Sequence, residues 1–558
     1  MFSFIKQHKI ITGAVTVAVV AGLATAGYYG YQAYKESHPT LLTTSEIKKN
    51  LGLKLTNKFT DDQEAANKTY ASAMKNSQYT VDNMYTKVNP YGTSPLTAFV
   101  IFQTDQKATV SYSVAGKTEA TTISNDVDGE TTTHKIPVVG LYADTANKVT
   151  LTIKYADGHT DEKTITLQTK ALPKAMSNIK IDVKTSETDK MSLGNNSLTV
   201  MARTTKEPFA IDAAGDIRWY STTYNEHIFK TLKNGHLLMM RKQNNSALVY
   251  NDLIETDYMG RIYKTYHFSN KTSGSDNATM KNKSEGETTA IHHDVIELPN
   301  GDLLATVSDG SKYIEDTMIV IDRQTGEIKR VIDFKKIFPT EMYTKYTSTT
   351  RADGGIDWLH QNSINYDESD DSIVISARNQ DLVMKFDYKT MKPIWILSSK
   401  AKSSWPKEWQ KYVLTYADGT SINGGQHDAT VVVGSHNGSK ETVTLYDNNI
   451  AVTNGDKKTS TKYSQGLQLE IDTKTMTAKE TWAYGKTRGT ANYTDRIGST
   501  ALLSNGNYLV DFGYLNEKNG DASNIVEVTA DNEVVFDVEL SNLQNKGYVY
   551  RAYRVNIK

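Results

Sequence analysis

One pattern of strand, tight turn and strand recurs along the second half of the chain, and this repeat limits the fold more than any other feature. Successive copies start at Phe229, Val295, Ser363, Ala429 and Ala501, a period of roughly 65–70 residues. The rest of each unit repeats the pattern, as in MIVIDRQTGEIKRVIDF and IVEVTADNEVVFDVEL. Four strands per unit are typical of a β-propeller blade.

The number of units predicts the size of the propeller. An earlier unit, LTVMARTTKEPFAIDAAGDIRWYST, raises the count to six, and the last strand, YVYRAYRVNIK, would close the ring. We therefore expect an all-β chain with a six-bladed β-propeller over residues 173–558, with seven blades as the alternative count. The 33 tyrosines against 13 phenylalanines suit this fold, because aromatic residues with a polar tip favour strands that have one wet face.

Composition excludes several classes of protein. The chain of 558 residues carries 63 Lys and Arg against 64 Asp and Glu, a net charge of −1. Nucleic-acid binders need an excess of Lys and Arg to neutralise phosphates, so this class is excluded. The chain has no cysteine, which excludes disulfides, thiolate metal sites and a cysteine nucleophile.

A second, smaller β domain precedes the propeller. Residues 89–172 alternate short strands, such as LTAFVIFQT and KVTLTIKY, with turn residues, as in a small β-sandwich. The stretch before it, residues 36–88, is polar and permits helices, and we interpret it as a stalk with short helices.

The N-terminus predicts export from the cytoplasm. No charged residue lies between Ile10 and Tyr34, and Lys6 and Lys9 precede this apolar segment. Its length is enough to span a bilayer, and positive residues on its N-terminal side keep that end in the cytoplasm. Residues 1–35 are therefore either a membrane anchor or a signal peptide cleaved near Ala26. Both interpretations place the body of the protein outside the cytoplasm, anchored to the membrane or secreted.

Histidines occur at one position of successive repeats. They directly precede or begin the first strand of a unit, at His292 and His293, at His360, and at His427. The following antiparallel strand returns to the same edge of the sheet, where Arg378 stands. A single histidine beside a strand is usually structural, but several in register predict a site at the mouth of the propeller.

Two kinds of chemistry suit a histidine ring. Three histidines can bind a metal ion, whereas imidazole and guanidinium groups can bind an oxyanion and transfer it. Because Arg378 would place a permanent positive charge beside a divalent cation, the oxyanion is favoured and no metal is expected.

At these residues the chain resembles the bacterial arylsulfate sulfotransferase family. The resemblance rests on NPYGTSPLTAFV, HHDVIELPNGDLL, DWLHQNSI with SARNQDLVMKFD, and GGQHDATV with LYDNN. These enzymes move a sulfuryl group from a phenolic sulfate ester to another phenol without a nucleotide sulfate donor. The resemblance implies a six-bladed propeller with the site at its central channel. Some members carry a cysteine pair, which this chain lacks.

The resemblance also implies roles for individual residues. His427 matches the nucleophilic histidine, and His360 and Arg378 match its catalytic partners. The implied substrate-binding residues are Asn362, one of His292 and His293, Thr500 or Ser499, and Tyr91 reaching in from the sandwich.

The expected reaction is a ping-pong transfer through a sulfohistidine, with no cofactor. The expected partners are an aryl sulfate donor, a phenol acceptor, the membrane through the N-terminal segment and a second copy of the chain in a homodimer. Two alternatives stay open at this point: a non-catalytic propeller that binds a ligand or scaffolds envelope proteins, and a metal-dependent hydrolase on the same histidines.

Overall fold

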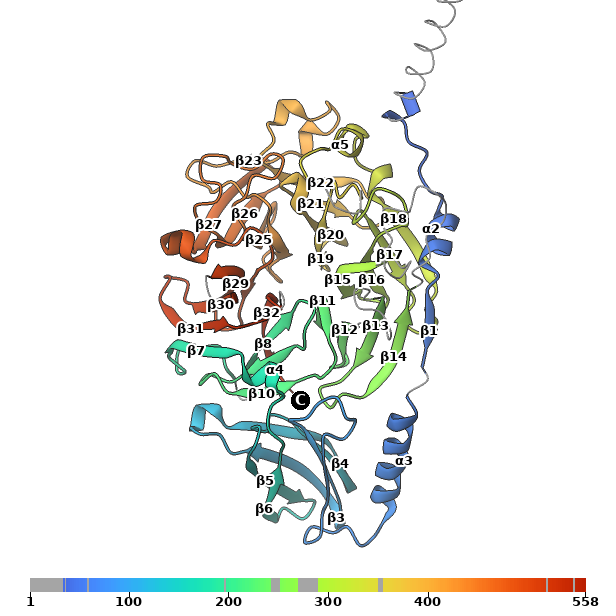
Figure 1. Ribbon diagram of the computed structural model, residues 1–558, viewed down its shortest axis with the longest axis vertical. Coiled ribbons are helices and arrows are strands. Elements are labelled where there is room, and N and C mark those ends of the chain that lie inside the picture. Colours follow the sequence, from blue (N-terminus) through green and yellow to red (C-terminus); the bar gives the residue numbers. More distant parts are fainter. Residues whose placement is uncertain are drawn as a thin grey trace, which may run out of the picture.

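The computed structural model describes residues 34–35, 37–57, 60–194, 197–241, 251–268, 290–349, 355–517, 520–544 and 547–557 (Figure 1). Strands dominate this part of the chain, and its longest helix, α3, covers only Asp61–Lys75. The prediction of an all-β chain is therefore confirmed. The predicted membrane segment and Ala26 lie outside the described residues, except for Tyr34 at the end of that segment. Within the described ranges, no helix combines the length and the apolar character needed to cross a membrane.

Six sheets of the described chain lie around a common centre in Figure 1. The strands of each sheet are given from the innermost outward. The first sheet contains β32 (Val549–Asn556), β8 (Ser197–Arg203), β9 (Phe209–Ile211) and β10 (Ile217–Tyr220), and the second contains β11 (Asn225–Thr231), β12 (Leu237–Arg241), β13 (Asp252–Thr256), β14 (Ile262–His267) and β1 (Lys54–Thr56). The third sheet contains β15 (Ile291–Glu297), β16 (Leu303–Val307), β17 (Thr317–Ile321) and β18 (Ile328–Asp333). The fourth sheet contains β19 (Gln361–Asp367), β20 (Ser372–Ala377), β21 (Leu382–Asp387) and β22 (Pro393–Ser398). The fifth contains β24 (His427–Val431), β25 (Lys440–Asp447), β26 (Gln465–Asp472), β27 (Thr477–Tyr484) and β23 (Thr415–Tyr416). The sixth contains β28 (Ser499–Leu502), β29 (Tyr508–Glu517), β30 (Gly520–Val528), β31 (Val534–Ser541) and β7 (Lys180–Ser186).

The innermost strands contact one another in a closed order. β11, β15, β19, β24, β28 and β32 are in contact in that sequence, and β11 also contacts β8, which pairs with β32. The last strand of the chain therefore joins the sheet of the first unit, so that residues at the starts of the inner strands meet around one axis.

The sequence repeat corresponds to one recurring turn. Gly235, Gly301 and Gly506 each follow an asparagine, and their φ angles are 81°, 84° and 89°. Glycine adopts this region easily because it has no Cβ. The same turn therefore joins the first two strands of three different sheets and keeps their inner ends in equivalent places.

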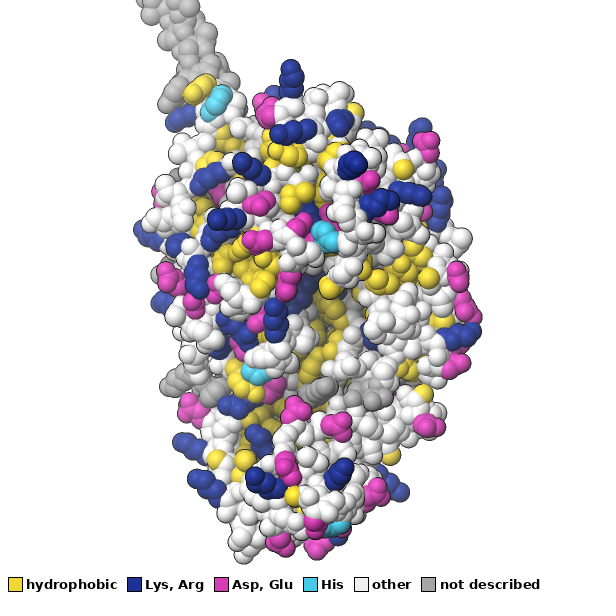
Figure 2. All heavy atoms as spheres, turned by 180° about the vertical axis from the view of Figure 1, so that it is seen from behind, with side chains coloured by type: hydrophobic (Ala, Val, Ile, Leu, Met, Phe, Trp, Pro, Cys, Tyr) yellow, Lys and Arg dark blue, Asp and Glu magenta, His cyan; other side chains and the backbone are white. Residues whose placement is uncertain are grey.

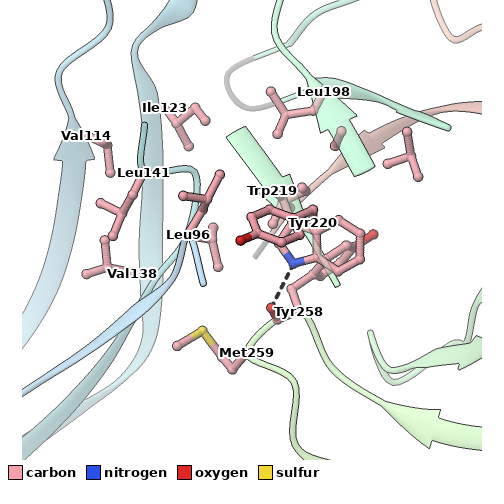
Figure 3. Packing of buried hydrophobic residues seen from close by; sticks show 14 of the residues in the cluster. Leu96, Val114, Ile123, Val138, Leu141, Leu198, Trp219, Tyr220, Tyr258 and Met259 are labelled. Carbon is pink, nitrogen blue, oxygen red and sulfur yellow. Dashed lines mark hydrogen bonds between the residues drawn. The ribbon is translucent and has the colours of Figure 1, made fainter. Parts of the chain in front are cut away.

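A seventh sheet packs against the ring from below in Figure 1. It contains β2 (Tyr85–Val88), β3 (Ala98–Val114), β4 (Ile123–Val138), β5 (Ala146–Tyr155) and β6 (Thr160–Gln168). Figure 3 shows Leu96, Ile123 and Leu141 of this part facing Trp219 and Tyr258 of the ring in one continuous core. The small domain is therefore fixed to the ring by apolar packing.

The chain before the seventh sheet also lies against the ring. Helix α2 (Thr44–Leu51) packs on β18, and β1 pairs with β14. Asn50 Nδ2 donates to the Asp309 carbonyl oxygen over 2.9 Å, and Gln63 Nε2 at the start of α3 donates to the Gly260 carbonyl oxygen over 2.9 Å. Figure 1 shows this segment along the outer side of the sheets.

Short helical turns connect several strands. They are α4 (Lys174–Ser177), α5 (Glu341–Thr344), η1 (Glu119–Thr121), η3 (Phe334–Lys336), η4 (Arg378–Gln380), η5 (Lys402–Ser404), η6 (Gln410–Tyr412) and η7 (Lys486–Asn492). On the face shown in Figure 2, positive and negative side chains are interspersed, in agreement with the near-zero net charge.

Candidate active site

Histidines from neighbouring inner strands form one cluster. The ring centroid of His293, on β15, lies 5.0 Å from that of His292, 4.6 Å from that of His360 and 4.8 Å from that of His227 on β11. His427 contacts this group through Tyr550, whose ring centroid lies 6.4 Å from that of His427 and 6.1 Å from that of His293. The histidines predicted from the repeat are thus close to one another.

The strands that carry these residues are irregular where the residues stand. Register shifts interrupt the pairing of five inner strands, between Asn225 and Phe229, between Ile291 and Val295, between Gln361 and Ser363, between His427 and Thr430, and between Val549 and Arg551. We call those of β15, β19 and β24 the three inner bulges. A bulge adds a residue to one strand and re-aims its side chains. His360, which directly precedes the bulge of β19, and Asp428, which lies within that of β24, have φ angles of 52° and 55° in the left-handed region.

His427 is held as a neutral imidazole. Its Nδ1 lies 2.7 Å from Asn448 Oδ1 and 3.2 Å from the Gly425 carbonyl oxygen, two acceptors, so Nδ1 carries the proton in this tautomer. Nε2 then keeps its lone pair, and the Ile497 backbone N–H approaches it at 3.3 Å. Burial, together with the positive charges of Arg378 and His360, holds the pKa of His427 well below its usual range. Nε2 is therefore available as a nucleophile at neutral pH.

Asn448 is fixed in turn by its amide nitrogen. Nδ2 donates to the carbonyl oxygens of Thr494, over 3.0 Å, and Ile497, over 2.9 Å. These bonds determine which amide atom is the oxygen, so the oxygen faces His427. The orientation of the imidazole therefore depends on two backbone carbonyls of one loop.

His360 has the opposite charge state. Its Nδ1 lies 2.6 Å from Asp357 Oδ2 and 2.8 Å from Glu315 Oε2. Burial opposes the charged form, but the two carboxylates outweigh it and raise the pKa of His360 to about 9. At neutral pH this side chain is an imidazolium and can give up a proton.

His292 and His293 are neutral. Burial lowers the pKa of His292 to about 4 and that of His293 well below its usual range. Their Nδ1 atoms lie 2.9 Å apart, which requires one of them to donate to the other. His293 contacts the rings of His227, His360 and Tyr550 as well as that of His292.

Arg378 and Asn362 supply donors beside the histidines. The guanidinium of Arg378 donates to Asn379 Oδ1 over 2.8 Å and to the Asp495 carbonyl oxygen over 2.9 Å. Its buried Nε has no hydrogen-bond partner within the described ranges. Asn362 Nδ2 donates to the Gln426 carbonyl oxygen over 2.8 Å, which leaves its second amide hydrogen for another acceptor.

Two residues expected at the site lie elsewhere. The Thr500 side chain packs over Gly466 of the neighbouring sheet, where a Cβ built on that glycine would lie 3.0 Å from Thr500 Oγ1. Tyr91 packs with ring centroids 5.8 Å from both Tyr70 and Phe99, and its hydroxyl donates to Asn67 over 2.8 Å. These contacts place Tyr91 in the core of the small domain and Thr500 between two sheets.

Several residues of the cluster were not among the predicted site residues. His227 has a signal in the sequence, because NEHIFK occupies the same position of its unit as IHHDVI. Glu226 Oε1 lies 2.8 Å from His227 Nε2. Glu315 and Asp357 come from connections between strands, so the strand repeat gave no signal for them. Asn448 directly follows β25, the returning strand of its unit, as Arg378 follows β20, so the repeat predicts both at the same edge of the ring.

One part of the cluster has the donor set of a metal site. Ligand atoms of His292, His293 and Glu315 lie within 4.8 Å of one another. Glu315 already pairs with the imidazolium of His360, and that positive charge opposes a divalent ion at the same carboxylate. The set therefore fits a metal poorly while His360 is protonated.

Known protein families and individual proteins are similar to this chain. The family described as Arylsulfotransferase (ASST) matches residues 182–551, and the Arylsulfotransferase Ig-like domain matches residues 85–170. The chain is 25% identical to the arylsulfate sulfotransferase AssT of Escherichia coli over 76% of this chain and 84% of that protein. It is also 25% identical to the AssT of Lelliottia amnigena, over 72% of this chain and 80% of that protein. A solved β-propeller domain, the Cps50 (Swd1) protein of Myceliophteria thermophila, matches at 8% identity over 72% of this chain and 94% of that one, with a TM-score of 0.26.

Proposed function

The chain belongs to the arylsulfotransferase family and is an aryl-sulfate sulfotransferase, and on this basis we propose that it works by a ping-pong reaction through a sulfated His427. One observation carries the proposal. A neutral histidine whose Nε2 carries no proton and a protonated histidine stand in one cluster, which is the pairing that a nucleophile and a general acid require.

The first half-reaction transfers the sulfuryl group to the enzyme. His427 Nε2 attacks sulfur and forms the N–S bond while the bond from sulfur to the phenolic oxygen breaks. The leaving oxygen takes the proton from His360 Nε2, so that a neutral phenol departs. His360 suits this step because Asp357 and Glu315 keep it charged until the proton is needed.

The second requirement is that hydrogen-bond donors stabilise the negative charge on the sulfuryl oxygens. The N–H groups of Arg378 and the second amide hydrogen of Asn362 are the donors we assign to these oxygens. A guanidinium suits this role because its planar donors match an oxyanion and it stays charged at any physiological pH.

The second half-reaction reverses the roles. His360, now neutral, removes the proton from the hydroxyl of the acceptor phenol as that oxygen attacks sulfur and the N–S bond breaks. His427 and protonated His360 are regenerated. Atoms and charge balance without a nucleotide, a metal or a redox partner.

We further propose the setting of this reaction. The six sheets act as the blades of a six-bladed propeller with the site at its axis, and the N-terminal apolar segment holds the enzyme at the membrane with its site outside the cytoplasm. The closed order of inner strands supports the first point, and the charge order around Lys6 and Lys9 supports the second.

Mass spectrometry tests the covalent step. The protein is mixed with 4-nitrophenyl sulfate without an acceptor and digested, and we expect one added sulfuryl group on the peptide that contains His427. His427→Ala should abolish turnover, whereas His159→Ala, at an exposed histidine of the small domain, should leave it unchanged. Full activity of His427→Ala together with an absent adduct would refute the proposal.

A further inference from the structure

Arg551 connects the strands that carry the proposed site. It lies on β32, directly after Tyr550, and its side chain is only 1% exposed. Its NH2 donates to the Asn362 carbonyl oxygen over 2.8 Å. Its NH1 lies 3.2 Å from Asp294 Oδ1, and its Nε lies 3.2 Å from Asp428 Oδ1. One guanidinium therefore contacts three other sheets of the ring.

Each of these contacts falls on one of the three inner bulges. Asp294 belongs to the bulge of β15, Asn362 to that of β19 and Asp428 to that of β24. Asp294 directly follows His293, and Asp428 directly follows His427. The residue that follows each of these histidines is thus paired with the same side chain.

The bulges need such support because their backbone is irregular. Asp428 has a φ of 55°, in a region that non-glycine residues adopt at a cost in energy. Besides Arg551, its carboxylate accepts from the Thr500 backbone N–H over 3.3 Å. A change in the Asp428 conformation would turn the neighbouring imidazole away from Asn448.

The charges and the shape of the group both require arginine. Arg551 lies between two carboxylates, and these outweigh burial so that the pKa of Arg551 stays well above its usual value. Lys230 also pairs with Asp294, over 3.1 Å, but contributes nothing at Asp428. A lysine at position 551 could not reach three partners in three directions, because its ammonium is a single point on a flexible stem.

We propose that Arg551 is a positioning residue of the transfer reaction, which holds the three inner bulges so that His427, His293 and Asn362 face one substrate. The inference rests on the proposed role of His427 as the nucleophile. It adds that the geometry of this nucleophile depends on the last strand of the chain.

Burst kinetics test the proposal. Rapid mixing with 4-nitrophenyl sulfate and no acceptor measures release of the first phenol, and in the wild-type enzyme we expect one equivalent per site. Arg551→Lys should slow this burst about 100-fold, the loss expected for a misplacement of about 1 Å, with little change in the substrate concentration that gives half the maximal rate. Arg554→Lys is the matched control, because Arg554 lies on the same strand, is 4% exposed and pairs with Glu527.

The outcomes are distinct. A slow burst in Arg551→Lys beside a wild-type burst in Arg554→Lys, at equal thermal midpoints, supports the positioning role. Equal bursts in both variants and the wild type overturn it, and so does an equal loss in both variants. If Arg551→Lys fails to fold, Asp428→Asn is the second test. Asparagine keeps the shape of the aspartate side chain and its tolerance of positive φ but removes the ion pair with Arg551. An unchanged burst in Asp428→Asn would overturn the inference. Absence of a burst in the wild type would instead refute the proposed function.

Discussion

His360 and His427 differ in charge although both are buried in one cluster. Burial alone would leave both imidazoles neutral, as it does for His292 and His293. The two carboxylates at His360 Nδ1 reverse this effect, whereas the acceptors at His427 Nδ1 are the neutral oxygens of Asn448 and Gly425. The nearest hydrogen-bond partner therefore decides which histidine serves as acid and which as nucleophile.

This difference predicts the pH profile. His360 has a pKa of about 9, so the rate of the first half-reaction should hold from neutral pH upward and fall as pH rises through about 9. Asp357→Asn removes one carboxylate and should move this fall to lower pH. The measurement is kcat/KM against pH, with phenyl sulfate more affected than 4-nitrophenyl sulfate because its leaving group needs the acid more.

The same shift affects stability. Since the pKa of His360 is raised above its ordinary 6.5, the pairing of charged His360 with Asp357 and Glu315 stabilises the fold fully below about pH 6.5 and loses this contribution as pH rises through about 9.

In the profile of kcat/KM against pH, a basic limb that stays in place in Asp357→Asn would contradict the assignment of His360 as the acid.

Among the connecting elements, the buried carboxylate of Asp316 joins the two loops that carry Glu315 and Asp357, the carboxylates beside His360. Asp316 follows Glu315, and its oxygens accept from Trp358 Nε1 over 2.6 Å and from Lys335 Nζ over 2.7 Å. Trp358 in turn follows Asp357. The distance between the two carboxylates at His360 therefore depends on the bond between Trp358 and Asp316.

Trp358→Phe tests this connection. It replaces the indole by a smaller phenyl ring and removes the N–H, and the lost donor alone should destabilise the fold by about 1–3 kcal/mol, because a buried carboxylate oxygen is left without it. Trp395→Phe is the matched control, since Trp395 Nε1 donates to buried Glu441 Oε1 over 2.6 Å in the next sheet unit. Both variants should lose similar stability in chemical denaturation, but only Trp358→Phe should shift the basic limb of the pH profile. A shift of equal size in both would show that the loops are not connected in this way.

The elements also show what the sequence could predict. The period of the strands placed His360 and His427 at equivalent points because a repeat fixes the position along a strand. It could not place Thr500, since neighbouring strand residues point to opposite faces and bulges change the count. Glu315 and Arg551 act between sheets, and their partners are distant in sequence. Tyr91 was expected at the site, but its hydroxyl donates to Asn67 of α3 and its ring packs against that of Tyr70.

At the scale of the whole molecule, the small domain is joined to the ring through a buried charge. Arg218 on β10 is 0% exposed and donates to the carbonyl oxygens of Thr121, over 2.6 Å, and Gly140, over 2.9 Å. Its NH1 also lies 2.8 Å from Oδ2 of Asp212, a side chain that is 3% exposed. The apolar core around Trp219 continues across the same boundary (Figure 3). Docking of the domain therefore includes a buried arginine that donates to two carbonyl oxygens of the small domain and is paired with Asp212 of the ring.

Arg218→Leu should destabilise the protein by about 3–5 kcal/mol, because it leaves Asp212 buried without its cation. Burial already raises the pKa of Asp212, and Arg218 opposes this rise. Without the arginine the folded-state pKa rises further above the unfolded value, so the loss of stability should be larger at about pH 8 than at about pH 5. Thermal unfolding at both pH values measures this. The double variant with Asp212→Asn should regain part of the stability and lose the pH dependence, whereas a pH-independent loss in Arg218→Leu would mean that the ion pair does not control the docking. The pH profile of turnover should stay unchanged in the folded variant, since Arg218 contacts none of the histidines.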